Sequence, residues 1–242
     1  MNNLDKPFNY VENQQQTIPV AKTFLSGVFM WMFLALGLTA ATAYLFASTE
    51  SLISLLYNPE TGGMSITGWI VMLAPFGLVL WMSVGFQKMS ASTMVLVFVM
   101  YSILMGASLS FIFLAFTGAS IAKTFVITSA MFGFMAVLGY TTKTDLTKFG
   151  SIMIMGLFGI IIASVVNLFM RSEMMDYIIS FIGVLVFTGL TAYDVQKLKR
   201  IGAGMETESE SGRKLTIYGA LTLYLDFINL FLFLLRFFGN RK

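Results

Sequence analysis

The chain has 242 residues, of which 57% are hydrophobic and only 11% are charged. A water-soluble domain usually carries about one quarter charged residues, so this composition excludes a soluble surface and indicates an exterior that faces lipid. Cysteine and histidine are absent, which excludes disulfide bonds, thiolate and histidine nucleophiles, and the metal or haem sites built from them. No cofactor is therefore expected, and the net charge of +3 does not indicate binding to nucleic acid.

The first 22 residues are polar, rich in Asn and Gln, and contain two prolines. Such a segment cannot bury enough apolar surface to order by itself, so we expect a flexible cytosolic tail over residues 1–22. The tail lacks the apolar core and cleavage site of a signal peptide, so the first hydrophobic run is expected to remain as a membrane anchor. Residues 23–242 are expected to form a single transmembrane domain.

Seven apolar runs follow the tail, each close to the length of about 20 residues that a membrane-spanning helix needs. They cover residues 23–47, 66–86, 94–116, 121–140, 150–170, 175–196 and 217–238. The links between them are short except for 48–65 and the hydrophilic link 197–216. The pattern predicts an all-α integral membrane protein with seven transmembrane helices.

Basic residues set the expected orientation. Ten of the 15 lysines and arginines fall in the tail and in the links on its side of the membrane, and an excess of basic residues is typical of the cytosolic side. The N-terminus is therefore predicted to be cytosolic. Only Arg236, Arg241 and Lys242 argue otherwise, and a re-entrant last run would bring them inside. The full spanning length of that run favours seven crossings.

Two stripes of small residues at four-residue spacing are expected to let helices approach closely in lipid. They are Ser102, Gly106 and Ser110 in the third run, and Gly159, Ala163 and Asn167 in the fifth.

Two aspartates lie inside apolar runs, where a charge costs about 2.5 to 3.5 kcal/mol at mid-helix. Asp226 lies well within the last run, and Asp194 lies near the cytosolic end of the sixth. At 100° per residue, Asp226 shares a narrow polar sector with Gly219, Thr222 and Asn229. Asp194 shares a similar sector with Ser180, Gly183, Phe187 and Thr191.

Both polar stripes are expected to turn away from lipid, which makes a face-to-face carboxylate pair plausible. Thr191 and Thr222 are candidates for lining or supporting a pore beside the pair, as are Asn167 and Asn229, which we expect to form hydrogen bonds between helices. Two alternatives remain open: Asp194 paired with Lys197 at a solvated helix end, and Asp226 as a lone protonated acid bonded to neighbouring groups.

Two carboxyl groups in contact cannot both ionise cheaply, so they hold one proton and titrate together. The protonated pair would join two helices. The doubly ionised pair would repel, or would offer oxygen ligands to a hard cation such as calcium. Asp194 and Asp226 are therefore the predicted pH sensor and the possible calcium contact.

Four sequence segments resemble the bacterial YccA-type branch of the Bax inhibitor-1 (transmembrane BAX inhibitor motif) family. They read MGASLSFIFLAFTGASIAKTF, GYTTKTDLTKFGSIMIMGLFGIIIASVVNLF, FTGLTAYDVQKLK and ALTLYLDFINLFLFLLRFFG. The resemblance runs from about residue 22 to the C-terminus. It implies seven helices with the last one central and surrounded by six others, and a location in the bacterial inner membrane.

The resemblance also implies a pH-sensitive calcium leak governed by an aspartate pair that matches Asp194 and Asp226. In some relatives a basic residue on the second helix bonds this pair, but residues 66–86 contain no Lys or Arg. Bacterial relatives are also associated with a membrane-bound quality-control protease, which makes such a protease a possible partner.

An intramembrane protease and an interaction protein are the two alternatives to a cation leak. Intramembrane aspartyl proteases also use two late aspartates, and Tyr193-Asp194 matches their first motif; the second motif requires Gly-x-Gly-Asp, whereas this chain has Leu223-Tyr224-Leu225-Asp226. No enzymatic activity is therefore predicted. A protein that modulates a membrane assembly, with the link 197–214 as a docking surface, is the alternative to a cation leak.

Overall fold

A computed structural model describes residues 10–58, 62–204 and 208–242, with side chains from residue 21 onward. Seven of its helices are long and apolar enough to cross a membrane, which confirms the predicted fold class. The elements are α1 (Tyr10–Ser48), α2 (Glu50–Leu56), β1 (Tyr57–Asn58), β2 (Gly63–Met64), α3 (Ile66–Gly85), α4 (Ala91–Ala115), α5 (Gly118–Thr141), α6 (Thr147–Met170), α7 (Glu173–Ala203) and α8 (Glu210–Phe238). The two short strands form an antiparallel hairpin between α2 and α3.

Most spanning helices begin at a Ser or Thr whose side chain accepts a hydrogen bond from the amide three residues later. This capping satisfies a backbone donor that the helix itself leaves unpaired. The capping residues are Ser65, Ser90, Thr117, Ser172 and Ser209. The helix starts can thus be read from the chain at these positions.

Three helices, α1, α7 and α8, extend by seven or more residues beyond their apolar runs. α1 reaches back to Tyr10, into the segment expected to be a flexible tail, while residues 1–9 lie outside the described part. α7 continues to Ala203 and α8 begins at Glu210, so most of the link 197–216 is helical and only 205–207 lie outside the described residues. The length of an apolar run reflects the thickness of the hydrocarbon layer. A helix can continue beyond that layer because adding residues to an existing helix avoids the cost of nucleating a new one.

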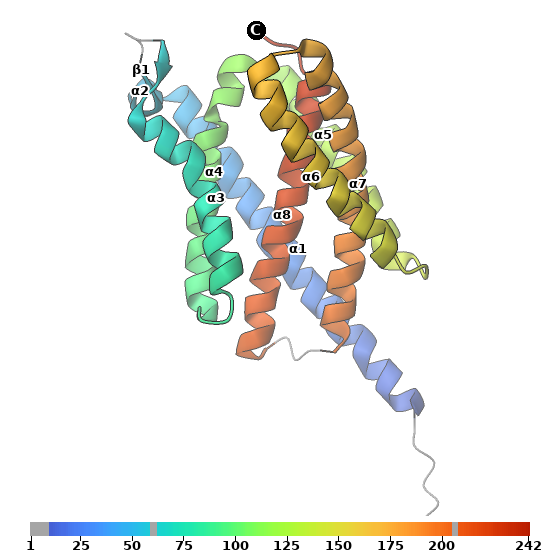
Figure 1. Ribbon diagram of the computed structural model, residues 1–242. Helices are drawn as coiled ribbons and strands as arrows, with labels where there is room; N and C mark the ends of the chain where they lie inside the picture. Colours follow the sequence, from blue (N-terminus) through green and yellow to red (C-terminus); the bar gives the residue numbers. More distant parts are fainter. Residues whose placement is uncertain (1–9, 59–61, 205–207) are drawn as a thin grey trace, which may run out of the picture.

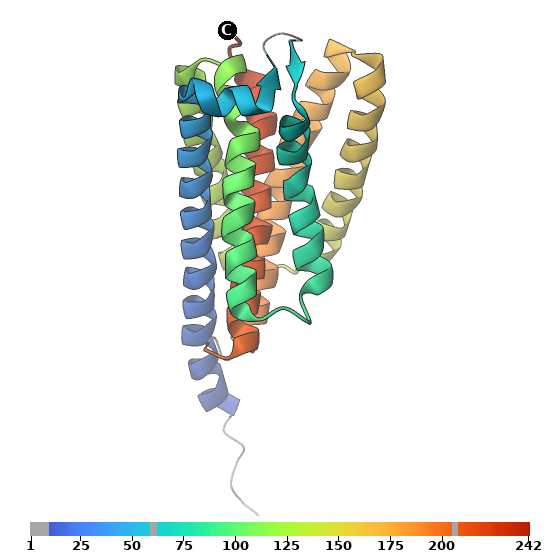
Figure 2. The same cartoon turned by 90° about the vertical axis from the view of Figure 1, so that its left-hand side faces the viewer.

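α8 lies at the centre of the bundle and packs against α1, α4, α5 and α7. α3 packs mainly on α4, and α6 packs on α7, so these two helices form an outer layer with little contact to α8. Figure 1 shows α8 between α3 and α6, and Figure 2 shows α1 and α4 running alongside it. The central last helix is confirmed: four of the other spanning helices pack closely on it, and α3 and α6 lie farther out.

The C-terminus is fixed at the end of the bundle opposite the N-terminal end of α1 (Figure 1). The amide of Thr117 donates to the carbonyl of Asn240 at 3.2 Å, and the amide of Lys242 donates to the carbonyl of Ala115 at 3.0 Å. These bonds join the last residues to the connection between α4 and α5. α8 therefore crosses fully, and the re-entrant alternative is wrong.

Only one of the two small-residue stripes forms a tight helix contact. Ser102, Gly106 and Ser110 are buried, and a Cβ added at Gly106 would lie 2.5 Å from the carbonyl oxygen of Thr39. The predicted close approach is therefore confirmed between α4 and α1. Gly159 is exposed with no atom near its would-be Cβ, so the prediction for the second stripe is wrong at that residue, because α6 turns another face to α7.

A buried hydrogen-bond network joins three helices. The Thr39 hydroxyl of α1 donates to the carbonyl of Ser102 on α4 at 2.9 Å and lies 2.7 Å from the hydroxyl of Tyr224 on α8. The ring of Tyr101 packs edge-on against Tyr224 at 5.4 Å. These contacts hold α8 in place at Tyr224, two residues before Asp226.

Candidate functional site

The carboxyl groups of Asp194 and Asp226 face each other within interaction distance across the α7–α8 contact. Asp226 is only 4% exposed, and Asp194 is half-buried. The structure thus brings together the two acids that the sequence singled out.

The packing of α7 against α8 determines this pairing. The two helices run antiparallel, and Leu198 touches Gly219 on the N-terminal side of α8. On the other side of the pair, the rings of Phe187 and Phe233 stack at 5.8 Å. The aspartates lie between these contacts, so neither acid can leave the other without a change in the helix packing.

The buried Oδ2 atom of Asp226 lacks a conventional hydrogen-bond donor in the described structure. It receives no hydrogen bond from any N–H or hydroxyl of the described residues. A contact between two carboxyl groups needs a proton between them, since two carboxylates only accept hydrogen bonds. A contact of this kind therefore requires that at least one of the two acids carries a proton.

Neither alternative for the isolated acids agrees with this geometry. Lys197 is near enough to attract Asp194 electrostatically, but the ion pairs of the described residues do not include these two side chains. Asp226 is not alone, because its buried carboxyl meets Asp194. The lysine adds a positive charge at the cytosolic edge of the pair.

None of the four supporting residues forms a hydrogen bond to either carboxyl group within the described part of the chain. The hydroxyls of Thr191 and Thr222 donate to carbonyls of their own helices at 2.8 and 3.0 Å, and the Asn229 amide donates within α8 at 2.8 Å. An interhelical hydrogen bond is therefore absent for Asn229 in the described structure. Asn167 does form one, to Asp176 of α7 at 2.9 Å, at the outer end of the bundle.

The two polar stripes differ in where they face. Ser180, Phe187 and Thr191 of α7 are buried, as predicted. On α8, Thr222 and Asn229 are half-exposed, whereas the Leu and Phe face of that helix is buried. That both stripes turn away from lipid stays a prediction for these two residues, and Asn229 lines a polar cavity at one end of the bundle. Because α8 is central, its apolar face fills the core, which leaves Thr222 and Asn229 on the less buried side of the helix.

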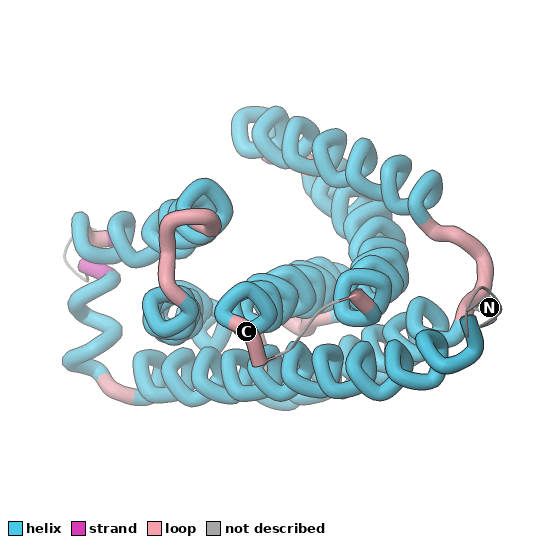
Figure 3. The backbone as a smooth tube through the Cα atoms, turned by 90° about the horizontal axis from the view of Figure 1, so that it is seen from below, coloured by secondary structure: helices cyan, strands magenta, loops and turns pink. Residues whose placement is uncertain are grey.

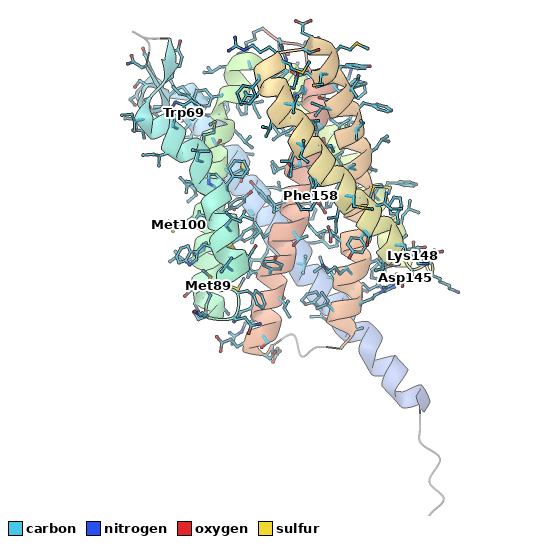
Figure 4. All side chains as sticks on the ribbon, in the orientation of Figure 1. Trp69, Met89, Met100, Asp145, Lys148 and Phe158 are labelled. Atoms are coloured by element: carbon cyan, nitrogen blue, oxygen red, sulfur yellow. The ribbon has the colours of Figure 1, made fainter. Side chains whose placement is uncertain are left out.

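An ion pair that the sequence analysis did not identify closes the cytosolic end of α7. The Arg200 guanidinium lies 2.8 Å from an oxygen of Asp145, which precedes α6. Hydrogen bonds from the hydroxyl and amide of Thr147, followed by the Arg200 contact, hold the pKa of Asp145 well below its usual range. Figure 4 shows Asp145 at the lower end of the bundle, with Lys148 nearby.

Gln196, two residues after Asp194, forms the second part of this contact. Its side-chain oxygen accepts from the amide of Leu146 at 2.9 Å, and its amide donates to the carbonyl of Thr144 at 2.8 Å. The α5–α6 link is thereby fastened to the helical turn that carries Asp194. Gln196 is only 5% exposed, and the sequence carried no signal for this contact because Gln196 stands between Asp194 and Lys197 at a polar helix end.

A polar cavity of about 630 Å³ opens at the outer end of α6, α7 and α8. Its lining includes Asn167, Arg171, Glu173, Asp176, Asn229, Arg236 and Arg241. Arg236 pairs with Asp176 at 3.7 Å. The cavity was not predicted, because its arginines come from three segments that only the fold brings together.

The described residues contain no group of three or more acidic side chains that could hold a metal ion. Asp194 and Asp226 together offer carboxylate oxygens from only two residues, fewer than the six to eight oxygen ligands of a resident calcium ion. α3 carries no Lys or Arg and packs on α4, so it supplies no basic partner to the pair.

Comparison with known proteins agrees with the resemblance seen in the sequence. The family model described as "Inhibitor of apoptosis-promoting Bax1" matches residues 21–242. The chain is 48% identical to the inner membrane protein YbhL of Escherichia coli K12, over 91% of this chain and 93% of that protein. It is 45% identical to an uncharacterized protein of Rickettsia prowazekii, over 91% of each chain. An uncharacterized membrane protein of Streptococcus pyogenes is 35% identical over 90% of this chain and 92% of its own length.

Proposed function

Because the chain belongs to the Bax inhibitor-1 family of membrane proteins, we propose that it is a calcium-permeable cation leak that the protonation of Asp194 and Asp226 opens and closes. The contact between these two carboxyl groups, without any other donor to the buried Asp226 oxygen, carries the proposal. Gain or loss of a proton by this pair changes the electrostatic interaction between α7 and α8 from attraction to repulsion or back.

With one proton between them, the acids attract, and α7 stays against α8. When that proton leaves, two negative charges face each other at contact distance in a site of low polarity, where repulsion is strong. Separation of the helices relieves this repulsion and exposes four carboxylate oxygens, the ligand type that calcium prefers. A rise in pH therefore favours the open form, and calcium compensates the charge of the opened pair as it passes.

Purified protein in liposomes loaded with a calcium-sensitive dye tests this mechanism. Calcium entry should rise with pH for the unmodified protein, and Asp226→Asn should abolish the pH dependence because an amide does not titrate. Glu50→Gln, an acid-to-amide change at an exposed site in α2, is the matched control and should keep the pH dependence. Calcium entry that ignores both pH and Asp226→Asn would refute the proposal.

The alternative is a protein that modulates a membrane-bound protease. Its candidate docking surface is the link 197–214, of which residues 205–207 lie outside the described part. Crosslinking in native membranes separates the two functions: a stoichiometric partner, together with liposomes that remain impermeable to calcium, would favour the interaction protein.

A further inference from the structure

One face of the central helix α8 is only partly covered by the other helices. Its half-exposed or exposed residues recur every three or four positions: Leu215, Tyr218, Thr222, Leu225, Asn229, Leu232 and Arg236. We call this set the open face. α3 and α6 stand on either side of it without packing extensively on α8, as Figure 1 shows from the front and Figure 3 shows along the bundle. In a membrane, this face must be covered by something apolar.

At its outer end, the open face runs into the polar cavity of about 630 Å³, which shares Asn229, Leu232 and Arg236 with it. Arg171 and Arg241 also line this cavity. Neither of these two arginines is ion-paired to an acid within the described residues, whereas Arg236 is paired with Asp176. The cavity lining thus carries three guanidinium groups and two carboxylates, those of Glu173 and Asp176. Two of the guanidinium groups are not neutralised by an ion pair within the described residues.

The arginines stand at the depth of lipid headgroups and are held in place by the backbone. Arg236 is in the last turn of α8, and Arg171 ends α6 in a left-handed conformation with φ 51°. Arg241 lies in the tail that pairs with Phe116. A guanidinium binds phosphate oxygens in a two-pronged geometry, so three of them lining one cavity at the ends of spanning helices suit a phosphate group.

Below the cavity, the open face suits an acyl chain. The Thr222 hydroxyl donates to a carbonyl of its own helix. Asn229 donates one N–H within the helix, and it lies where the open face meets the polar cavity. The distance from Arg236 to Leu225 along α8 is about 16 Å at 1.5 Å per residue, close to half of the roughly 30 Å hydrocarbon thickness. One chain of an outer-leaflet lipid therefore reaches from the cavity to the middle of the helix.

We propose that an anionic phospholipid occupies this groove, with its phosphate at Arg171, Arg236 and Arg241 and an acyl chain along the open face of α8. This site is separate from the aspartate pair and does not depend on the cation leak.

Native mass spectrometry of the purified, delipidated protein tests the proposal with phosphatidylglycerol and phosphatidylcholine of the same acyl chains. Phosphatidylglycerol should bind more tightly, and the double variant Arg171→Gln, Arg241→Gln should weaken its binding by about tenfold or more. Lys123→Gln, at an exposed position near the start of α5 on the same side of the membrane, is the control and should leave binding unchanged. Equal binding of the two lipids, or an unaffected double variant, would overturn the headgroup assignment.

A second arm tests the acyl chain. Leu232→Trp fills the open face while leaving every arginine in place, and it should weaken binding of phosphatidylglycerol by a similar factor. Glycerol phosphate, which has the headgroup charge without the chains, should not compete; effective competition would show a site for a free phosphate instead of a lipid. A dimer that must dissociate before lipid binds would show that a second copy covers the open face and would also overturn the proposal.

Discussion

Removing the hydroxyl of Tyr224 should destabilise the protein by a small and calculable amount. The single proton of the Thr39 hydroxyl is used in its bond to the Ser102 carbonyl at 2.9 Å, so the 2.7 Å contact must be donated by Tyr224. Tyr224→Phe removes that one bond and leaves no donor unpaired, because Thr39 keeps its bond to Ser102. Such a bond is worth about 0.5 to 1.5 kcal/mol in soluble proteins and about 0.6 kcal/mol on average between transmembrane helices.

We therefore expect Tyr224→Phe to lower the free energy of unfolding by about 1 kcal/mol, which is about a fivefold change in the folded-to-unfolded ratio. Thr39→Val should cost more, about 1 to 3 kcal/mol, because it leaves the buried hydroxyl of Tyr224 without an acceptor. Equilibrium unfolding in mixed micelles of mild detergent and dodecyl sulfate measures both.

The matched control is Tyr44→Phe, which removes a hydroxyl from a tyrosine that is 64% exposed and should have no measurable effect. The double variant Thr39→Val, Tyr224→Phe should cost less than the sum of the two single changes, since both remove the same bond. A Tyr224→Phe protein as stable as the Tyr44→Phe control, or strictly additive effects, would refute the role given to this network.

Two further predictions concern the packing and the cytosolic ion pair. Asp145→Asn should lower the thermal stability at neutral pH by weakening the contact with Arg200. The pKa of Asp145 is lower in the folded protein than in the unfolded chain, where it is about 4. The ionised Asp145 therefore stabilises the fold fully above about pH 4, and this stabilisation is lost as the pH falls further. Melting curves of the two proteins should therefore converge only in strong acid, and convergence near neutrality would contradict the assignment. Gly106→Ala should destabilise by about 1 to 3 kcal/mol, because the new Cβ would lie 2.5 Å from a carbonyl oxygen of α1. Gly159→Ala, with no atom near its Cβ, should be neutral or stabilising in the same unfolding assay.

The spanning helices and the aspartate pair could be predicted from the sequence because each follows from a local cost. A backbone in lipid must satisfy its own hydrogen bonds, so an apolar run of sufficient length forms a helix whatever its neighbours are. A carboxyl group in such a run is expensive unless it meets a partner. Asp226 had one plausible partner on the adjoining helix, and the structure places Asp194 there.

The outer cavity and the orientation of α8 could not be predicted in this way. Arg171, Arg236 and Arg241 lie in separate segments that meet only through the packing of α6, α7 and the C-terminal tail. Helical periodicity divides α8 into a polar and an apolar face, but it does not say which face meets lipid. The usual rule fails because this helix is surrounded on its apolar side, which leaves Thr222 and Asn229 on the open side.

The central place of α8 also has a consequence for biosynthesis. Six spanning helices enter the membrane before the one that packs against α1, α4, α5 and α7. Before α8 is made, α1 and α4 can already pack through Gly106 and the Thr39–Ser102 hydrogen bond, but the surfaces of α1, α4, α5 and α7 that α8 covers still face lipid or the insertion machinery. Completion of the core must therefore await the synthesis of α8, and a ribosome that stalls within α8 would release a protein without its core.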